Sequence, residues 1–248
     1  MLKKLYDKSK LYFALAWIVA YCVLLSVGDS LSSMLGIEKA VTLVIGIALS
    51  AVLLVFFWKN DLFKSYGLCR ASASAGSMLY YLPVFLMLTA NLWHGVALNC
   101  GFLETLLYIL SMLCVGFLEE IIFRGLLFEA MKKDNVKSAI IVSSITFGIG
   151  HIVNLLNGSG AELLPNMLQV VYATVAGFMF VMVYYRSKSL FVCIASHGIF
   201  NALSVFSSEA SASPRAQILT AIALTIITGS YAIYLALAFK GKSSKARE

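Results

Sequence analysis

The stretch TLLYILSMLCVGFLEEIIFRGLLFEAM, residues 105–131, decides the fold of this chain. The run is mostly apolar and longer than the roughly 20 helical residues that cross a bilayer. Its second half nevertheless carries Glu119, Glu120 and Arg124. A charge at the centre of a membrane helix costs roughly 3 kcal/mol or more. We therefore expect a membrane helix whose charged side chains face the interior of a bundle and form a polar site.

Apolar runs of similar length recur along the whole sequence. Hydrophobic residues make up 60% of the chain and charged residues 12%, which differs strongly from a soluble globular composition. The runs do not show the alternation of polar and apolar residues that is typical of a membrane β-barrel. We therefore predict an all-α, polytopic membrane bundle that forms a single membrane domain over residues 1–248. Its spans, about eight, are expected at residues 11–27, 40–58, 77–93, 105–131, 138–156, 165–185, 189–206 and 216–239.

The net charge of +7 is distributed unevenly between the loops. Basic residues precede the first predicted span and follow each even-numbered span, whereas the other loops are mainly acidic. The positive-inside rule then places both termini in the cytoplasm. Because the basic residues flank membrane spans, the charge does not indicate a nucleic-acid partner. The residues concerned are Lys3, Lys4, Lys8, Lys10, Lys59, Lys64, Arg70, Lys132, Lys133, Lys137, Arg186, Lys188, Lys240, Lys242, Lys245 and Arg247.

The three charged residues of the fourth predicted span are expected to differ in role. Glu120 and Arg124 are four residues apart, so they share one helical face and can form an ion pair. Adjacent helical residues diverge by about 100°. Glu119 is therefore expected to point elsewhere and to face a cavity. A purely structural role for the pair of Glu120 with Arg124 remains an alternative.

Two other predicted spans carry polar residues at the same spacing of four. Phe147 and His151 share one face of the fifth span, and His197 and Asn201 share one face of the seventh. At about 1.5 Å of rise per residue, His151 and Asn201 lie about 20 Å from the nearest basic loop, as does Glu119. We expect the three helices to bring these groups together at one depth. A simple hydrogen bond from Asn201 to a neighbouring helix is an alternative.

This set of side chains is suited to hydrolysis. A carboxylate and an imidazole can hold a water molecule and take its proton, and a second His with an Asn can stabilise an oxyanion. Two His and one Glu can also form a catalytic zinc site, so Glu119, His151 and His197 are the candidate ligands if zinc is present. The sequence has no HExxH motif, and we favour a site without a cofactor.

The glycines in or near the polar spans are expected to let helices approach closely. These residues are Gly116, Gly125, Gly148, Gly150 and Gly177.

The ordered motifs resemble the CAAX protease and bacteriocin-processing family, which includes the type II CAAX endopeptidases. The family pattern of EExxxR, FxxxH and HxxxN on successive helices of an eight-helix core matches residues 119–124, 147–151 and 197–201. The resemblance implies that Glu119 and His151 activate water and that His197 and Asn201 stabilise the oxyanion. It also implies a metal-free glutamate mechanism, with Glu120, Arg124 and Phe147 in supporting positions. The catalytic core would then lie at about residues 105–206.

The resulting hypothesis is an intramembrane endopeptidase of a bacterial plasma membrane. Its partners would be membrane lipid and a peptide or lipidated protein, including prenylated CAAX-type substrates. One alternative is a non-catalytic membrane protein for immunity or binding. Another is a proton-coupled transporter, because buried Glu, His and Arg residues also form proton relays.

Overall fold

The computed structural model describes residues 2–156, 162–208 and 212–238, and all regular structure in these ranges is helical. A single isolated bridge pairs Val96 with Ser207, and the described ranges contain no strand. The all-α prediction is therefore confirmed. The elements are α1 (Leu2–Lys8), α2 (Lys10–Leu35), α3 (Ala40–Lys59), η1 (Lys64–Tyr66), η2 (Gly76–Tyr81), α4 (Leu82–Leu88), η3 (Ala90–Leu92), α5 (Phe102–Glu119), the π-helical η4 (Glu120–Phe128), α6 (Glu129–Met131), α7 (Val136–Gly150), η5 (His151–Leu155), α8 (Leu163–Ser187), α9 (Phe191–Leu203), η6 (Ser204–Phe206) and α10 (Pro214–Ala238).

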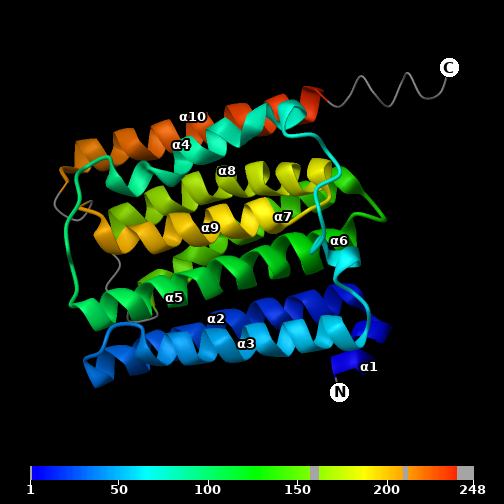
Figure 1. Cartoon of the computed structure of the whole chain (residues 1–248), viewed down its shortest axis with the longest axis horizontal. Coiled ribbons are helices and arrows are strands. Elements are labelled where there is room, and N and C mark those ends of the chain that lie inside the picture. Colours follow the sequence, from blue (N-terminus) through cyan, green and yellow to red (C-terminus); the bar gives the residue numbers. More distant parts are fainter. Residues whose placement is uncertain (1, 157–161, 209–211, 239–248) are drawn as a thin grey trace.

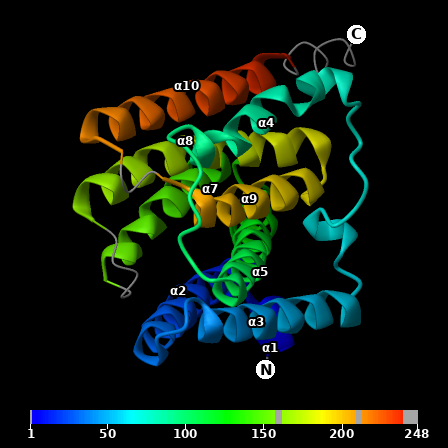
Figure 2. The same cartoon turned by 60° about the vertical axis from the view of Figure 1, so that its left-hand side comes forward.

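In Figure 1 the long helices lie in layers, and Figure 2 shows that α5 is steeply inclined to α3 and α10. In both views α2 and α3 lie together at one side of the bundle, and α10 lies with α4 at the opposite side (Figure 2). Helices α7, α8 and α9 occupy the middle, and α5 connects them to the α2–α3 pair. The packed pairs are α8 with α10, α7 with α8, α5 with α9, and α3 with α5. The junction of α5 and η4, which carries the two glutamates, is buried inside the bundle.

Local sequence signals set several helix ends. Ser9 precedes α2 and accepts a hydrogen bond from the Tyr12 amide at 3.2 Å, as preferred at helix N-termini. Asn135 caps α7 in the same way through the Ser138 amide at 3.0 Å. Helix α2 ends at Gly36, whose φ of 67° suits a residue without a side chain. The Gly36 cap lets α2 turn tightly into α3.

Within the described residues, six helical stretches are long and apolar enough to cross a membrane. They agree with six of the eight predicted spans, and the chain forms an integral membrane protein with several apolar helices. The count of eight and the cytoplasmic location of both termini stay predictions. The six stretches are Lys10–Leu35, Ala40–Lys59, Phe102–Met131, Val136–Leu155, Leu163–Ser187 and Pro214–Ala238.

The other two predicted spans correspond to shorter apolar helices, Gly76–Leu92 and Phe191–Phe206. The first is not continuous, because Leu79, Tyr80 and Tyr81 have φ values of 49°, 50° and 58°. An α-helix requires negative φ, so helix α4 begins only at Leu82. This break was not visible in the hydropathy of residues 77–93.

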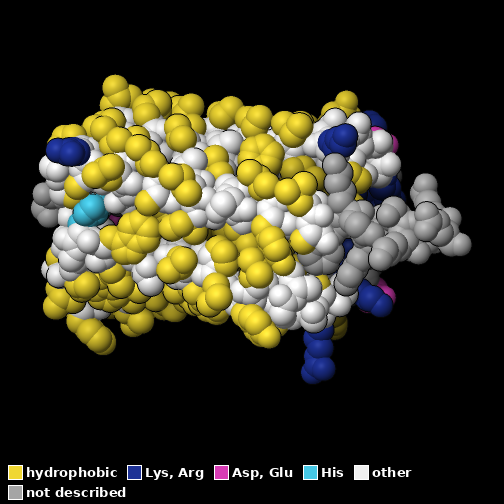
Figure 3. All heavy atoms as spheres, turned by 90° about the horizontal axis from the view of Figure 1, so that it is seen from above, with side chains coloured by type: hydrophobic (Ala, Val, Ile, Leu, Met, Phe, Trp, Pro, Cys, Tyr) yellow, Lys and Arg dark blue, Asp and Glu magenta, His cyan; other side chains and the backbone are white. Residues whose placement is uncertain are grey.

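The outer surface of the bundle is strongly apolar. Val19 of α2, Val44 of α3 and Ile226 of α10 are each more than 60% exposed. Figure 3 shows hydrophobic side chains over most of one face, with Lys and Arg at its two ends and most of them at the right-hand end. A soluble monomer rarely exposes contiguous apolar surface of this extent. The surface is that of a protein surrounded by lipid.

The two ends of the bundle differ in charge. We call the end that carries α1 the basic end; there the Leu190 amide donates to the Gly67 carbonyl at 2.8 Å. At the far end, the Ala97 amide donates to the Phe206 carbonyl at 2.9 Å. Among the described residues, the basic end holds the lysines and arginines that were predicted to be cytoplasmic. The lysines and arginines of the far end, counted over the same residues, are only Lys39 and Arg215. The predicted basic residues of the C-terminal tail, 240–247, lie outside the described residues.

Three of the five glycines allow close helix contact. A Cβ atom on Gly116 would lie 2.5 Å from the backbone nitrogen of Gly198 in α9, and one on Gly148 would overlap Thr174 of α8. A Cβ on Gly177 would lie 3.0 Å from the Ser144 carbonyl oxygen of α7. Gly125 and Gly150 have room for a side chain, so for them the prediction is wrong.

Candidate active site

The two glutamates lie where the helical pattern of the chain changes. Helix α5 ends at Glu119, and the next nine residues form the π-helix η4, all of them buried. A π-helical turn widens the backbone and often marks a functional site. The Glu120 carboxylate lies 3.1 Å from the Arg124 guanidinium, and both side chains are 0% exposed. The predicted ion pair is therefore confirmed.

Arg124 is held mainly by aromatic rings. Its guanidinium carbon lies 4.0 Å from the ring centre of Phe147 and 5.4 Å from that of Phe180. Within the described part of the chain the guanidinium nitrogens make no hydrogen bond of good geometry, although one lies within ion-pair distance of Glu120. A cation over an aromatic face is stabilised by the ring quadrupole, most strongly away from water. The Phe147 ring thus covers the Arg124 guanidinium, and its supporting role in the site stays a prediction.

His197 connects the two glutamates, which sequence reasoning did not expect. Its Nδ1 lies 2.7 Å from Oε1 of Glu120, and its Nε2 lies 3.3 Å from Oε2 of Glu119. Only the contact with Glu120 is a hydrogen bond. The contact with Glu119 is at ion-pair distance, and Oε2 of Glu119 has no hydrogen-bond partner among the described residues. The ring also stacks on Phe180, with centres 5.3 Å apart. Glu119 and Glu120 diverge as predicted, but they share this histidine.

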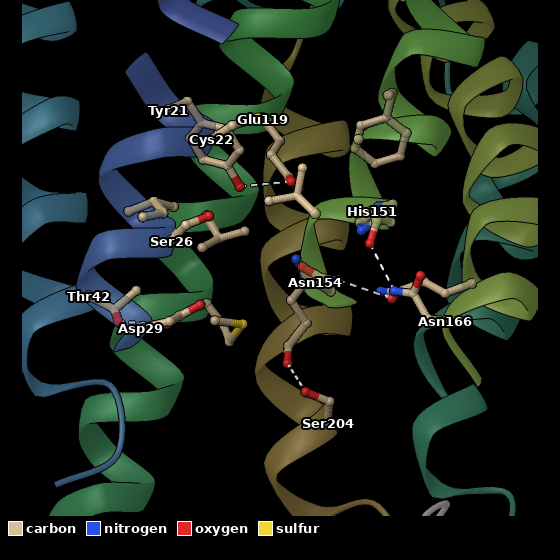
Figure 4. A pocket seen from close by; sticks show the side chains of 18 of the residues that line it. Tyr21, Cys22, Ser26, Asp29, Thr42, Glu119, His151, Asn154, Asn166 and Ser204 are labelled. Carbon is tan, nitrogen blue, oxygen red and sulfur yellow. Dashed lines mark hydrogen bonds between the residues drawn. The ribbon is translucent and has the colours of Figure 1, made fainter. Parts of the chain in front are cut away.

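Glu119 faces a cavity, as predicted, and is also bound by a residue that sequence reasoning missed. The Tyr21 hydroxyl of α2 donates to Oε1 of Glu119 at 2.8 Å (Figure 4). Tyr21 is 8% exposed and lies inside the first predicted span. Its phenol was a polar group in the middle of an apolar run, which was the available signal. Nothing in the sequence paired it with Glu119.

His151 lies at the junction of α7 and η5, on the opposite wall of the cavity from α2 (Figure 4). Its ring packs edge-on against Phe147, with centres 5.2 Å apart. Asn166 of α8 donates through Nδ2 to the His151 carbonyl at 2.8 Å. Asn166 is 1% exposed, and its Oδ1 is buried without a partner. This second missed residue holds the backbone at His151 and leaves one acceptor unused.

Two cavities meet at the predicted catalytic residues. The larger, ≈ 390 Å³, is lined by Glu119, His151 and Asn201 together with Tyr21. The smaller, ≈ 30 Å³, is lined by His151, Asn201 and His197. The smaller volume is enough for a water molecule, which needs roughly 10–15 Å³ on this measure. The structure therefore distributes the four predicted residues over two cavities, with His151 and Asn201 on the walls of both.

The candidate zinc ligands are Glu119, His151 and His197. Among the residues that the structure describes, no group of three or more His, Cys, Asp or Glu side chains has an arrangement that could hold a metal ion. Glu119 and His197 instead contact each other directly.

Comparisons with known proteins agree with the motifs. Residues 101–203 match the family model described as "Type II CAAX prenyl endopeptidase Rce1-like". Over 101 residues the chain is 33% identical to "Putative membrane peptidase YdiL" of Bacillus subtilis (strain 168). This alignment covers 40% of the chain and 36% of that protein. The resemblance predicted from the motifs is therefore confirmed over residues 101–203, the segment that contains all of them.

Proposed function

We propose that this protein is an intramembrane endopeptidase that hydrolyses peptide bonds of membrane-associated or prenylated CAAX-type substrates in a bacterial plasma membrane. The observation that carries the proposal is the position of Glu119. Its carboxylate lines a cavity together with His151 and Asn201, inside an apolar bundle. The family match over residues 101–203 supports peptide hydrolysis as the reaction.

In the proposed mechanism, Glu119 and His151 hold a water molecule in the cavity and Glu119 takes its proton. The water oxygen bonds to the carbonyl carbon of the substrate, which becomes tetrahedral. The Tyr21 hydroxyl, at 2.8 Å from Glu119, orients the carboxylate toward the cavity. When the C–N bond breaks, the proton held by Glu119 passes to the leaving amine.

Negative charge on the substrate oxygen needs donors that are already in place. We assign this role to His197 and Asn201, which both line the smaller cavity beside His151. His197 is held by stacking on Phe180 and by its contact with Glu120. Its Nε2, close to Glu119, is the nitrogen that would point at the substrate. Glu120 and Arg124 then act as positioning residues for His197.

The catalytic core would extend beyond residues 105–206. The Tyr21 contact links Glu119 to a helix 98 residues away in the sequence. We therefore propose that the chain works as one membrane domain, in which α2 forms a wall of the active site. No cofactor is needed in this mechanism, whereas zinc would place Glu119, His151 and His197 in ligand roles.

The proposal is tested by cleavage of quenched fluorescent peptides, with prenylated CAAX peptides among them. Wild type, Glu119→Gln and His151→Ala are purified in detergent and assayed with and without a zinc chelator. Cleavage that survives the chelator and is lost in both variants would support the glutamate mechanism. Cleavage lost to the chelator and restored by zinc would overturn it in favour of a metalloprotease.

Two outcomes would favour the alternatives. If wild type binds peptides without cutting them, and Glu119→Gln binds equally well, a non-catalytic immunity or binding protein is the better description. If no peptide is bound or cut, but proteoliposomes show proton uptake that depends on Glu119, a transporter is favoured.

A further inference from the structure

The larger cavity extends from the active site toward one end of the bundle only. Beyond Glu119 and His151, its lining includes Asp29 and Lys39 at the turn between α2 and α3. On the other side it includes Glu162, just before α8, and Ser204, just after α9. These positions all belong to the far end, and Figure 4 shows Asp29 and Ser204 below the level of Glu119. The cavity therefore runs from the middle of the bundle to the far end.

The path from Glu119 to the basic end is filled by side chains. The π-helix η4 continues from Glu120 in that direction, and all of its residues are buried. Leu118, Ile121 and Phe128 are 0% exposed. Arg124 closes the remaining space between Phe147 and Phe180. Close packing of this kind leaves no room for a peptide chain.

The charge of the two ends gives the direction of the cavity in the membrane. Cytoplasmic loops of membrane proteins carry an excess of Lys and Arg. Among the described residues, the lysines and arginines at the far end are Lys39 and Arg215. Lys39 forms an ion pair with Asp29 at 2.8 Å. The basic end carries basic residues in each of its turns, from α1 to the α8–α9 connection. The far end is therefore the non-cytoplasmic end.

The size and lining of the cavity suit a polypeptide chain. Tyr21 and Asp29 both line it from α2, eight residues and so about 12 Å apart along the helix. An extended peptide covers this length with about three to four residues. The wall includes the side-chain amides of Gln169 and Asn166. Side-chain amides can form hydrogen bonds with a peptide backbone.

We propose that the active site takes its substrate from the non-cytoplasmic side of the membrane, so that the protein cuts an exported peptide or an extracytoplasmic peptide segment. This inference rests on the proposed function and names its substrate class. Of the substrates in the proposed function, it selects membrane-associated peptide segments outside the cytoplasm, and it excludes prenylated CAAX-type termini that lie on the cytoplasmic side of the intact membrane. The proposal is decided by the side of the membrane on which the cavity opens.

Three native cysteines lie at the positions that test this direction. Cys22 lines the cavity one residue after Tyr21. Cys100 lies in the far-end loop before α5, and Cys69 lies at the basic end, where its thiol is 3.4 Å from the Lys188 carbonyl oxygen. All three are partly exposed. Variants that keep only one of them, with the other cysteines replaced by Ser, give matched reporters.

The experiment adds a charged, membrane-impermeant methanethiosulfonate reagent to right-side-out and to inverted membrane vesicles. We expect Cys22 and Cys100 to be modified in right-side-out vesicles and Cys69 in inverted vesicles. Modification of Cys22 from the same side as Cys69 would overturn the proposal. A Ser26→Cys variant, one turn closer to the far end, provides a second reporter on the cavity wall. Failure to modify this variant from the Cys100 side would also overturn it.

A cleavage assay in the same vesicles separates this inference from the proposed function. An impermeant quenched peptide that detergent-solubilised enzyme cuts should be cut by right-side-out vesicles, and by inverted vesicles only after permeabilisation. Cleavage by sealed inverted vesicles would overturn the direction while leaving the peptidase assignment intact. If the solubilised protein cuts no peptide, the proposed function fails, and the cysteine reporters still decide where the cavity opens.

Discussion

Glu119 and Glu120 are adjacent in the sequence, yet they belong to two regions of different character. Glu120 lies in a closed cluster with Arg124, Phe147, Phe180 and His197, where charges are paired and covered by aromatic rings. Glu119 lies at the edge of the open cavity, where its Oε1 accepts a hydrogen bond from the Tyr21 hydroxyl.

The difference shows how a membrane bundle can hold charge at its centre. In the closed cluster the Glu120 carboxylate lies between the Arg124 guanidinium and the His197 imidazole, so the burial of its charge is compensated. In the open cavity the carboxylate keeps access to water and substrate. At the α5–η4 junction, Glu120 thus contributes to the stability of the bundle, and Glu119 is available for the proposed reaction. His197 is the physical link between them.

The largest expected effect is the loss of activity when Glu119, the glutamate of the open cavity, is replaced. We expect Glu119→Gln to lower kcat/KM by roughly 10²- to 10⁴-fold, the usual contribution of a general base. Its thermal unfolding should change little, because Gln keeps the size of the side chain and can still accept from Tyr21. Peptide cleavage and unfolding in the same detergent measure both quantities. Residual activity close to that of wild type would show that another group takes the proton.

The next effect is the loss of stability when Glu120, the glutamate of the closed cluster, is replaced. We expect Glu120→Ala to destabilise the protein by roughly 3–5 kcal/mol, because it leaves the buried Arg124 without its carboxylate. The double variant Glu120→Gln, Arg124→Met should recover part of this loss, because it removes both charges. Denaturant unfolding of the two variants and wild type compares the two losses of stability. A Glu120→Ala protein as stable as wild type would show that the closed cluster does not depend on the ion pair.

A smaller effect tests the helix contact that brings the two regions together. Gly116→Ala should destabilise by about 1–3 kcal/mol, the usual cost of overpacking, because its Cβ would lie 2.5 Å from the Gly198 backbone in α9. Gly150→Ala is the matched control, since a Cβ there meets nothing within 4 Å. Thermal unfolding of both variants gives the comparison. Equal stability would mean that α5 and α9 can separate without loss.

The smallest effect tests the hydrogen bond from Tyr21. Tyr21→Phe should lower kcat/KM by about threefold to tenfold, since a hydrogen bond contributes about 0.5–1.5 kcal/mol and 1.36 kcal/mol is a factor of about ten in rate. Tyr12→Phe on the same helix should have no effect, because Tyr12 is 62% exposed on the outer surface. Cleavage rates of the two variants are compared at matched protein concentration. An equal change of kcat/KM in both variants would show that the Tyr21 hydroxyl does not contribute to catalysis.

The sequence by itself determined the helical membrane class, six of the spans, the ordered motifs and the pair of Glu120 with Arg124. These features are local. Hydropathy over about 20 residues reports a span, and a spacing of four reports a shared helical face. For the same reason the sequence placed Phe147 with His151 and His197 with Asn201.

Only the tertiary structure decided which groups from different helices meet. The partners Tyr21 with Glu119 and His197 with Glu120 are 98 and 77 residues apart, so no local period relates them. The break at Leu79–Tyr81 and the side on which the cavity opens depend in the same way on how neighbouring helices pack. Hydropathy records whether a residue prefers lipid to water. It does not record which neighbour that residue meets inside the bundle, and the chemistry of this site depends on those neighbours.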